Sequence, residues 1–299
     1  MLARMQRLLV SGVIAAAIAW LAWSRHVGAA SVWQLLGLLL ILLPHAPVLA
    51  VEFALLAILG NSSPAVAPSK GALLAAWAGE VVHGVKVFGW RQPFRSRAIA
   101  DAPGAMPANR RGVLLLHGYV CNRGLWNPWL RALRQRGIAF VALNLEPVFG
   151  DIDDYVAEID SAVRHLEGST GMAPVIVAHS MGGLAARAWL RHCSADARVA
   201  HVITIGTPHH GTWLARFGFS RNARQMRRAS RWLLALAAAE PAARAAQFTC
   251  FYSHCDNIVF PAATATLPGA DNRHLPGRAH VHMVSSTEPF TELLRRLEG

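Results

Sequence analysis

The chain has 299 residues, of which 54% are hydrophobic and only 15% are charged. Soluble domains contain about 25% charged residues, so this composition excludes a disordered chain and indicates a segment that lies in lipid. The formal net charge is +12, but no pattern typical of a nucleic-acid-binding domain is present, and we expect no nucleic-acid partner. The four cysteines form no CxxC pair and are too few for a disulfide scaffold.

The charged residues are distributed unevenly. Of the 29 basic and 17 acidic residues, only Arg4, Arg7, Arg25 and Glu52 lie within residues 1–60. The chain therefore divides into an apolar leader and a basic, soluble body.

The leader contains two apolar stretches. The first is uninterrupted, and the second is broken mainly by the Pro-His-Ala-Pro segment at 44–47 and by Glu52. We expect transmembrane helices over about 8–24 and 32–55, with the prolines kinking the second. His45 and Glu52 either mark a function inside the membrane or face the partner helix or the lipid headgroups.

Basic residues flank the two expected spans. Arg4 and Arg7 precede the first, and several more follow the second: Lys70, Lys86, Arg91, Arg95 and Arg97. The positive-inside rule then predicts an inner-membrane protein with both chain ends and the body in the cytoplasm. A cleaved signal peptide, or an odd number of spans, would place the body outside.

Residues 61–110 are expected to connect the membrane anchor to the body. Asn61 to Pro68 is rich in turn and breaker residues, which is typical of a linker. Apolar residues then recur at three- and four-residue spacing and predict an amphipathic helix on the body or the bilayer: Leu74, Trp77, Val81, Val85 and Phe88.

The body, 111–299, alternates short aliphatic runs with helical patterns. One such pattern begins near Ile152, preceded by Asp151, which suits the start of a helix. This alternation predicts an α/β fold with a mostly parallel, doubly wound sheet. The expected strands are Val113–Leu116, Ala139–Leu143, Val175–Ala178, Val202–Ile205 and Phe248–Tyr252.

Polar residues follow these strands where each one ends. They are His117 to Tyr119, His179 to Gly183, Thr207 to Gly211, and Asp256. Ligands of such sheets bind beyond the carboxyl ends of the strands, so we expect the functional site there.

Ser180 stands between a buried strand and a helical run, with small neighbours at Ala178, Gly182 and Gly183. A serine hydroxyl is a poor nucleophile unless it projects from a sharp turn toward a base. The pattern predicts such a turn at Ser180, with Ala178 in the place where the usual G-x-S-x-G motif has its first glycine.

With these motifs, residues 112–298 resemble the α/β-hydrolases, especially the bacterial serine lipases and esterases. Ala-His-Ser-Met-Gly-Gly resembles a variant nucleophile motif of small lipases. The resemblance implies a helical cap or lid at about 211–246. It also implies that the Tyr119 and Met181 N–H groups form the oxyanion hole.

The same resemblance implies the remaining roles. Asp256, in a segment matching S-x-x-D-x-x-V, is the expected acid of the triad. His274, His280 and His282 follow it; the Pro-Gly-x-x-His pattern favours His280, and His282 is the close alternative. His117 is expected to orient the oxyanion loop, and the other histidines expected at the substrate pocket are His179, His209 and His210.

The cap region contains one expected amphipathic helix. Its arginines fall on one stripe that either meets anionic headgroups or faces solvent: Arg221, Arg224, Arg227, Arg228 and Arg231. No residue spacing fits a metal site, and we expect neither metal nor cofactor.

These patterns favour a membrane-anchored serine ester hydrolase acting on acyl esters or lipids by an acyl-enzyme mechanism. The same triad also serves acyltransferases and thioesterases. A non-catalytic membrane scaffold with a hydrolase-like body is the alternative from another class. No obligate protein partner is evident.

Overall fold

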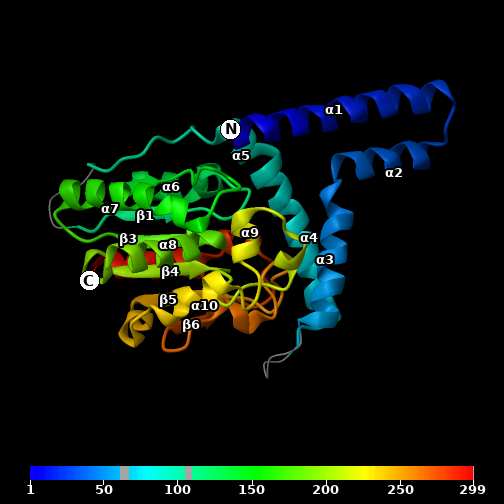
Figure 1. The fold of residues 1–299 in the computed structure, drawn as a ribbon. Coiled ribbons are helices and arrows are strands. Elements are labelled where there is room, and N and C mark those ends of the chain that lie inside the picture. Colours follow the sequence, from blue (N-terminus) through cyan, green and yellow to red (C-terminus); the bar gives the residue numbers. More distant parts are fainter. Residues whose placement is uncertain (61–66, 105–109, 299) are drawn as a thin grey trace.

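The computed structural model describes residues 1–60, 67–104 and 110–298, in which N-terminal helices pack against an α/β body (Figure 1). The body has a six-stranded sheet in the order β2-β1-β3-β4-β5-β6, with every neighbouring pair parallel. The strands are β1 Val113–Leu116, β2 Phe140–Ala142, β3 Val175–His179, β4 His201–Ile205, β5 Phe248–Tyr252 and β6 Asp271–His274.

Five of these strands agree with the prediction, and the fold class is confirmed. The sixth, β6, has the polar sequence Asp-Asn-Arg-His and lies largely exposed at the sheet edge. It lacks the apolar run by which the other strands were recognised, so no hydrophobic pattern marks it.

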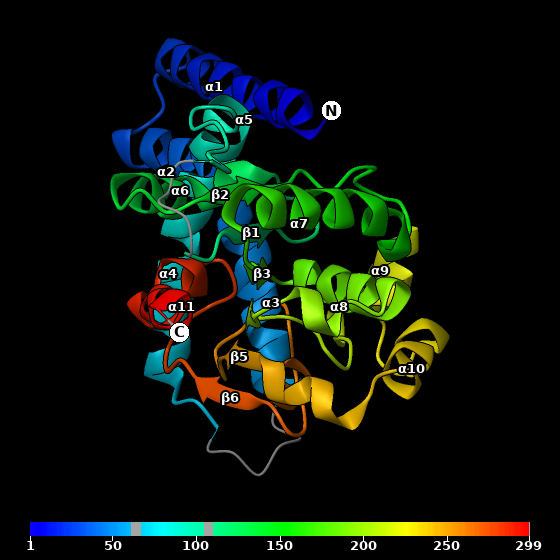
Figure 2. The ribbon, with the colours of Figure 1, turned by 90° about the vertical axis from the view of Figure 1, so that its left-hand side faces the viewer.

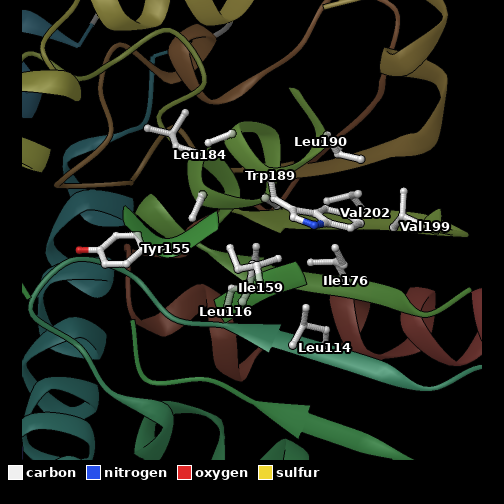
Figure 3. Close-up of a cluster of buried hydrophobic side chains, with 14 of the residues drawn as sticks. Leu114, Leu116, Tyr155, Ile159, Ile176, Leu184, Trp189, Leu190, Val199 and Val202 are labelled. Atoms are coloured by element: carbon white, nitrogen blue, oxygen red, sulfur yellow. The ribbon is translucent and has the colours of Figure 1, made fainter. Parts of the chain in front are cut away.

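Helices cover both faces of the sheet (Figure 2). On one face lie α6 (Asn127–Gln135) and α11 (Thr287–Glu298), and on the other lie α7 (Val156–Thr170) and α8 (Met181–Cys193). A hydrophobic core lies on each face of the sheet, and alternate residues of β1 pack in one core or the other, because successive side chains of a strand point to opposite faces. Leu114 and Leu116 pack toward α7 and α8, as Figure 3 shows, whereas Val113 and Leu115 pack in the other core.

The described part of the N-terminal region consists mainly of helices. They are α1 (Leu2–His26), α2 (Ser31–Leu42), α3 (His45–Leu59) and α4 (Lys70–Gly84), which continues through the π-helix η1 (Val85–Arg91) into α5 (Gln92–Arg95). Ser69 caps α4 by accepting a hydrogen bond from the Ala72 N–H at 3.1 Å.

Two helices in the described part of the chain are long and apolar enough to cross a membrane, Leu2–His26 and the continuous Lys70–Arg95. The first matches the span expected at 8–24. The stretch expected to be one kinked span at 32–55 forms the helix pair α2 and α3, which is bent by 70° next to Pro44 and would be a third candidate if the pair crosses as one span. Most of the expected linker, 61–66, lies outside the described residues.

Helices α3 and α4 pack on the body through a small apolar cluster: Phe53, Leu56, Ala76, Cys255, Phe260 and Ala279. Leu74 and Val85 of the predicted apolar stripe are exposed, so these two residues do not pack on the body and stay predicted to face the bilayer. The buried positions along this helix are Ala76, Glu80 and Val87. The face buried on the body, which includes the polar residue Glu80, thus lies beside the predicted apolar stripe and not on it.

The cap between β4 and β5 departs from the expected single helix. It contains α9 (Arg221–Gln225) and α10 (Arg231–Ala238), separated by a turn in which Ala229 has a φ of 54°. Ser230 caps α10 by accepting from the Leu233 N–H at 3.2 Å. The break removes the single cationic stripe, and Arg227 instead donates to the carbonyls of Ala215 and Gly218.

Candidate active site

Ser180 lies between β3 and α8 in a strained turn, with φ 55° and ψ −128°. Such a positive φ is costly for a residue with a side chain, and it projects the hydroxyl away from the strand. The turn is held by two hydrogen bonds: the Ser180 N–H donates to Ile205 O at 2.9 Å, and Thr207 Oγ1 donates to Ser180 O at 2.8 Å. Positive partial charge at the start of α8 lies next to this serine.

The surrounding glycines are required by close packing. A Cβ at Gly182 would lie 2.6 Å from Leu116 O, and one at Gly183 would lie 2.2 Å from Thr207 Oγ1. A Cβ at Gly118 would lie 2.8 Å from the Cβ of Ser180. The loop after β1 and the Ser180 turn therefore touch, and only residues without a Cβ allow that approach.

Asp256 and His280 form a buried pair beyond the end of β5. His280 Nδ1 lies 3.0 Å from both carboxylate oxygens, and Asp256 Oδ1 also accepts from the N–H groups of Ile258 and Val259. Burial alone would lower the pKa of His280, but the charge and hydrogen bond of Asp256 raise it above its ordinary value. With Nδ1–H donated to Asp256, Nε2 is left as the basic nitrogen.

His179, which directly precedes Ser180, contacts His280 and so links the Ser180 turn to the Asp256–His280 pair. His179 Nε2 lies 3.2 Å from His280 O, and the two rings are 4.7 Å apart. No hydrogen bond joins the Ser180 hydroxyl to His280 among residues 1–60, 67–104 and 110–298. Catalytic hydrogen bonds are often long before substrate binds, so this geometry is compatible with a nucleophile and its base.

The loop after β1 contains Tyr119 and His117. The N–H groups of Tyr119 and Met181 have no acceptor within the described part of the chain. Behind them, His117 is buried, with Nδ1 2.9 Å from Gly118 O and Nε2 accepting from the Leu145 N–H at 2.9 Å. Burial lowers the pKa of His117 to about 4, so it is a neutral residue that orients this loop.

The two histidines after β4 lie away from the Asp256–His280 pair. His209 is buried, and its Nε2 lies 3.0 Å from Thr204 Oγ1. His209 and His210 line a cavity of about 690 Å³ beneath the cap, together with residues of α10 such as Leu233 and Leu234. The residues lining this cavity do not include Ser180, which is itself buried.

The alternative histidines are placed elsewhere. His282 stacks on the His83 ring at 4.2 Å and lies 2.9 Å from Arg278. His274 pairs with His254 at the sheet edge, with 2.9 Å between their ring nitrogens. Of the three candidates, His280 has the contact with Asp256.

The sequence did not predict that polar side chains of the N-terminal helices support these loops by hydrogen bonds. Glu52 in α3 accepts from Asn257 Nδ2 at 2.7 Å, and Asn257 Oδ1 accepts from the His280 N–H at 3.3 Å. Glu80 in α4 accepts from the N–H groups of Val281 and His282. The one sequence signal was Glu52, the sole acidic residue of the leader.

A third support lies beside the oxyanion loop. Gln6 in α1 donates to Gln92 Oε1 at 2.7 Å and accepts from Asn122 Nδ2 at 3.4 Å. Asn122 also donates to Gln92 O at 3.1 Å. Helices α1, α3 and α4 thus each supply one buried or half-buried polar side chain to a different loop of the site. His45, the other polar residue of interest in the leader, lies 3.1 Å from Val81 O on the neighbouring helix.

The cap also contacts the oxyanion loop. The hydroxyl of Tyr119 lies 3.0 Å from Ser220 Oγ at the start of α9, and its ring packs edge-on against Phe149. Arg221 of the same helix pairs with Asp151 at 3.0 Å. These contacts hold the start of α9 against the loops that follow β1 and β2.

Comparison with known proteins agrees with this fold. Residues 152–230, which include the Ser180 turn, match the model of a PGAP1-like alpha/beta domain. No curated protein sequence matches the chain significantly.

Solved structures of lipases superpose on the body. The mature form of Bacillus licheniformis lipase BlEst2 is 18% identical, with a TM-score of 0.56, covering 64% of this chain and 96% of that one. Aspergillus fumigatus lipase B is 20% identical, with a TM-score of 0.54, covering 64% of this chain and 54% of that one. The chain therefore spans about half of the fungal lipase. At these identities the likeness establishes the fold, which is that of the α/β-hydrolases.

Proposed function

We propose that the protein is a membrane-anchored serine hydrolase of carboxylic esters, with Ser180 as nucleophile, His280 as general base and Asp256 as the acid that orients it. The observation that carries the proposal is the buried contact of His280 Nδ1 with both Asp256 oxygens, beside a serine in a strained turn. A module that only binds needs neither an oriented base nor backbone strain at a serine.

In the acylation step, His280 Nε2 takes the hydroxyl proton of Ser180 as the oxygen attacks the ester carbonyl. Negative charge then develops on the carbonyl oxygen. The N–H groups of Tyr119 and Met181 stabilise it, and each such donor is worth about 2.7–4 kcal/mol in comparable sites. The carbon–oxygen bond to the alcohol breaks, and His280 returns its proton to the leaving alcohol.

Deacylation repeats this sequence with water. His280 removes a proton from water, the hydroxide attacks the acyl-enzyme, and Ser180 leaves with the proton that His280 returns. The carboxylate of Asp256 balances the imidazolium charge in both half-reactions. The products are a carboxylic acid and an alcohol.

The substrate we propose is an acyl ester of a membrane lipid, because the body is attached to helices of which two are apolar enough to cross a bilayer. We place two spans in the membrane, α1 and the bent pair formed by α2 and α3, and the body in the cytoplasm, following the basic residues that flank the apolar stretches. Transfer of the acyl group to another alcohol would use the same first half-reaction.

The test is turnover of p-nitrophenyl butyrate by the full chain in detergent. Ser180→Ala should lower kcat by about 10⁴- to 10⁶-fold with an unchanged melting temperature, whereas the exposed control Ser169→Ala should keep wild-type turnover. A fluorophosphonate probe should label the wild type and the control but not Ser180→Ala. Undiminished turnover by Ser180→Ala would remove this serine from the chemistry.

A further inference from the structure

A second cavity lies between the N-terminal helices and the oxyanion loop. Its volume is about 550 Å³, within the range of about 300–1,000 Å³ typical of ligand sites. Its walls come from α1, the junction of α2 with α3, and the turn from α4 into η1. The apolar lining includes Met5, Leu9, Val13, Leu49, Val85 and Phe88.

Two residues that line this cavity are neighbours of the proposed catalytic groups, although Ser180 and His280 themselves do not line it. Val120, which lines it, directly follows Tyr119, whose N–H is the proposed oxyanion donor. Glu80, which also lines it, accepts the hydrogen bond from the Val281 N–H, one residue beyond His280. The cavity is therefore separated by one residue from the proposed oxyanion donor, and by one hydrogen bond from the backbone that follows the proposed base.

The chemistry of the lining selects an apolar occupant. The cavity beneath the cap is lined in part by Arg216, Arg227 and Arg228. An acyl chain bound there would remove water from these charged side chains, which costs free energy. The cavity beside Val120 has mainly aliphatic and aromatic walls, with Gln6, His45 and Glu80 as its polar lining residues, and one wall is α1, a helix apolar enough to lie in lipid. An acyl chain entering it from a bilayer passes from one apolar environment to another.

We propose that this cavity holds the fatty acyl chain of the ester while its carbonyl lies at Tyr119 and Ser180. The inference rests on the proposed function and deepens it by naming the substrate as a long-chain acyl ester drawn laterally from the membrane. The N-terminal helices are then part of the substrate site, as well as an anchor.

Gly89 offers the sharpest test, because it lines the cavity and an added Cβ there would meet only Val85 Cγ1, at 3.7 Å. Gly89→Leu therefore fills space without displacing backbone, and Val13→Phe is a second filling variant from the opposite wall. Gly12→Leu is the matched control in α1: Gly12 is not part of the lining, and an added Cβ there has nothing within 4 Å.

The measurement is kcat/KM for p-nitrophenyl palmitate divided by that for p-nitrophenyl butyrate, with the full chain in detergent micelles. Each buried methylene contributes about fourfold, so the loss of two or more should lower this ratio by about tenfold or more in Gly89→Leu and Val13→Phe. Gly12→Leu should keep the wild-type ratio, as should Leu234→Trp in the cap cavity.

A wild-type ratio in both filling variants would overturn the inference. So would a ratio that falls only in Leu234→Trp, because the acyl chain would then lie beneath the cap. Fluorophosphonate labelling of Ser180 separates these results from failure of the proposed function. Labelling with an unchanged ratio refutes the acyl site alone, whereas absence of both labelling and turnover refutes the hydrolase.

Discussion

Glu80 and Val281 lie 201 residues apart in sequence, and a 2.8 Å hydrogen bond joins the Val281 N–H to the carboxylate of Glu80. The same carboxylate accepts from the next N–H, that of His282, at 2.9 Å. The helix that enters the body from the apolar leader thus fixes the backbone immediately after His280. We regard Glu80 as a positioning residue for the proposed base.

The first prediction concerns this contact. Burial raises the pKa of Glu80 to about 7, and its ionised form helps to raise the pKa of His280. Glu80→Gln keeps an oxygen for one N–H but removes that negative charge. Because hydrogen bonds to charged groups are worth about 1.5–3 kcal/mol, kcat should fall by about 10- to 100-fold. The acid limb of the pH profile should also move to lower pH. The exposed control Glu288→Gln should change neither, and a fall in kcat with an unmoved limb would leave Glu80 with a structural role only.

The second prediction concerns Asp256. Asp256→Asn should lower kcat by about 10⁴-fold, because the amide no longer holds His280 in the tautomer that leaves Nε2 basic. Steady-state turnover of p-nitrophenyl butyrate measures this effect, and circular dichroism checks the fold. A loss smaller than tenfold in a folded variant would mean that Asp256 does not orient the base.

The third prediction follows from the raised pKa of His280, which gives activity and stability opposite pH dependences. The base must be neutral, so kcat/KM should fall as pH drops through a value above 6.5, the ordinary pKa of histidine. The protonated ring instead gains from Asp256, so its contribution to the free energy of unfolding is complete below the unfolded-state pKa and disappears as pH rises through the folded-state pKa.

The readout for stability is the difference in unfolding free energy between Ser180→Ala and Ser180→Ala/His280→Gln, from urea titrations between pH 5 and 9. The comparison is needed because other buried histidines, such as His117 and His209, have lowered pKa values, so their contribution to the free energy of unfolding increases with rising pH. A difference that grows with rising pH would refute the assigned shift.

The fourth prediction concerns packing at the nucleophile turn. Gly182→Ala would place a Cβ 2.6 Å from Leu116 O, a backbone atom that cannot move aside easily, and should destabilise the fold by about 1–3 kcal/mol. Gly168→Ala, in α7 with nothing within 4 Å, should instead stabilise it by up to about 1 kcal/mol. Equal urea midpoints for the two variants would contradict this reading of the turn.

The fifth prediction concerns orientation in the membrane. A fluorescent protein fused after the last residue should be bright, and alkaline phosphatase at the same place should be inactive, because the body is proposed to be cytoplasmic. The reversed pattern would place the body on the other side and would imply an odd number of spans.

The central strands could be predicted from sequence because each is an apolar run that ends in polar residues, as at Val175 to Ser180. The histidine in contact with Asp256 was favoured over His282 because its Pro-Gly-x-x-His segment resembles that of the α/β-hydrolases. These features are local, and a single segment of sequence contains the whole signal.

The supports of the site could not be predicted in this way. Glu52, Glu80 and Gln6 act on residues far along the chain, and no periodicity links Glu80 to Val281. The break between α9 and α10 was not predicted for a different reason. It depends on the positive φ of Ala229, and alanine ordinarily favours a continued helix.

Mass spectrometry of the acid-quenched protein, taken milliseconds after mixing with p-nitrophenyl butyrate, tests the proposed chemistry most directly. We expect the mass to rise by one butyryl group, with the adduct on the peptide that contains Ser180 and none in Ser180→Ala. Turnover without any adduct, or with the adduct on another residue, would contradict catalysis by Ser180, His280 and Asp256.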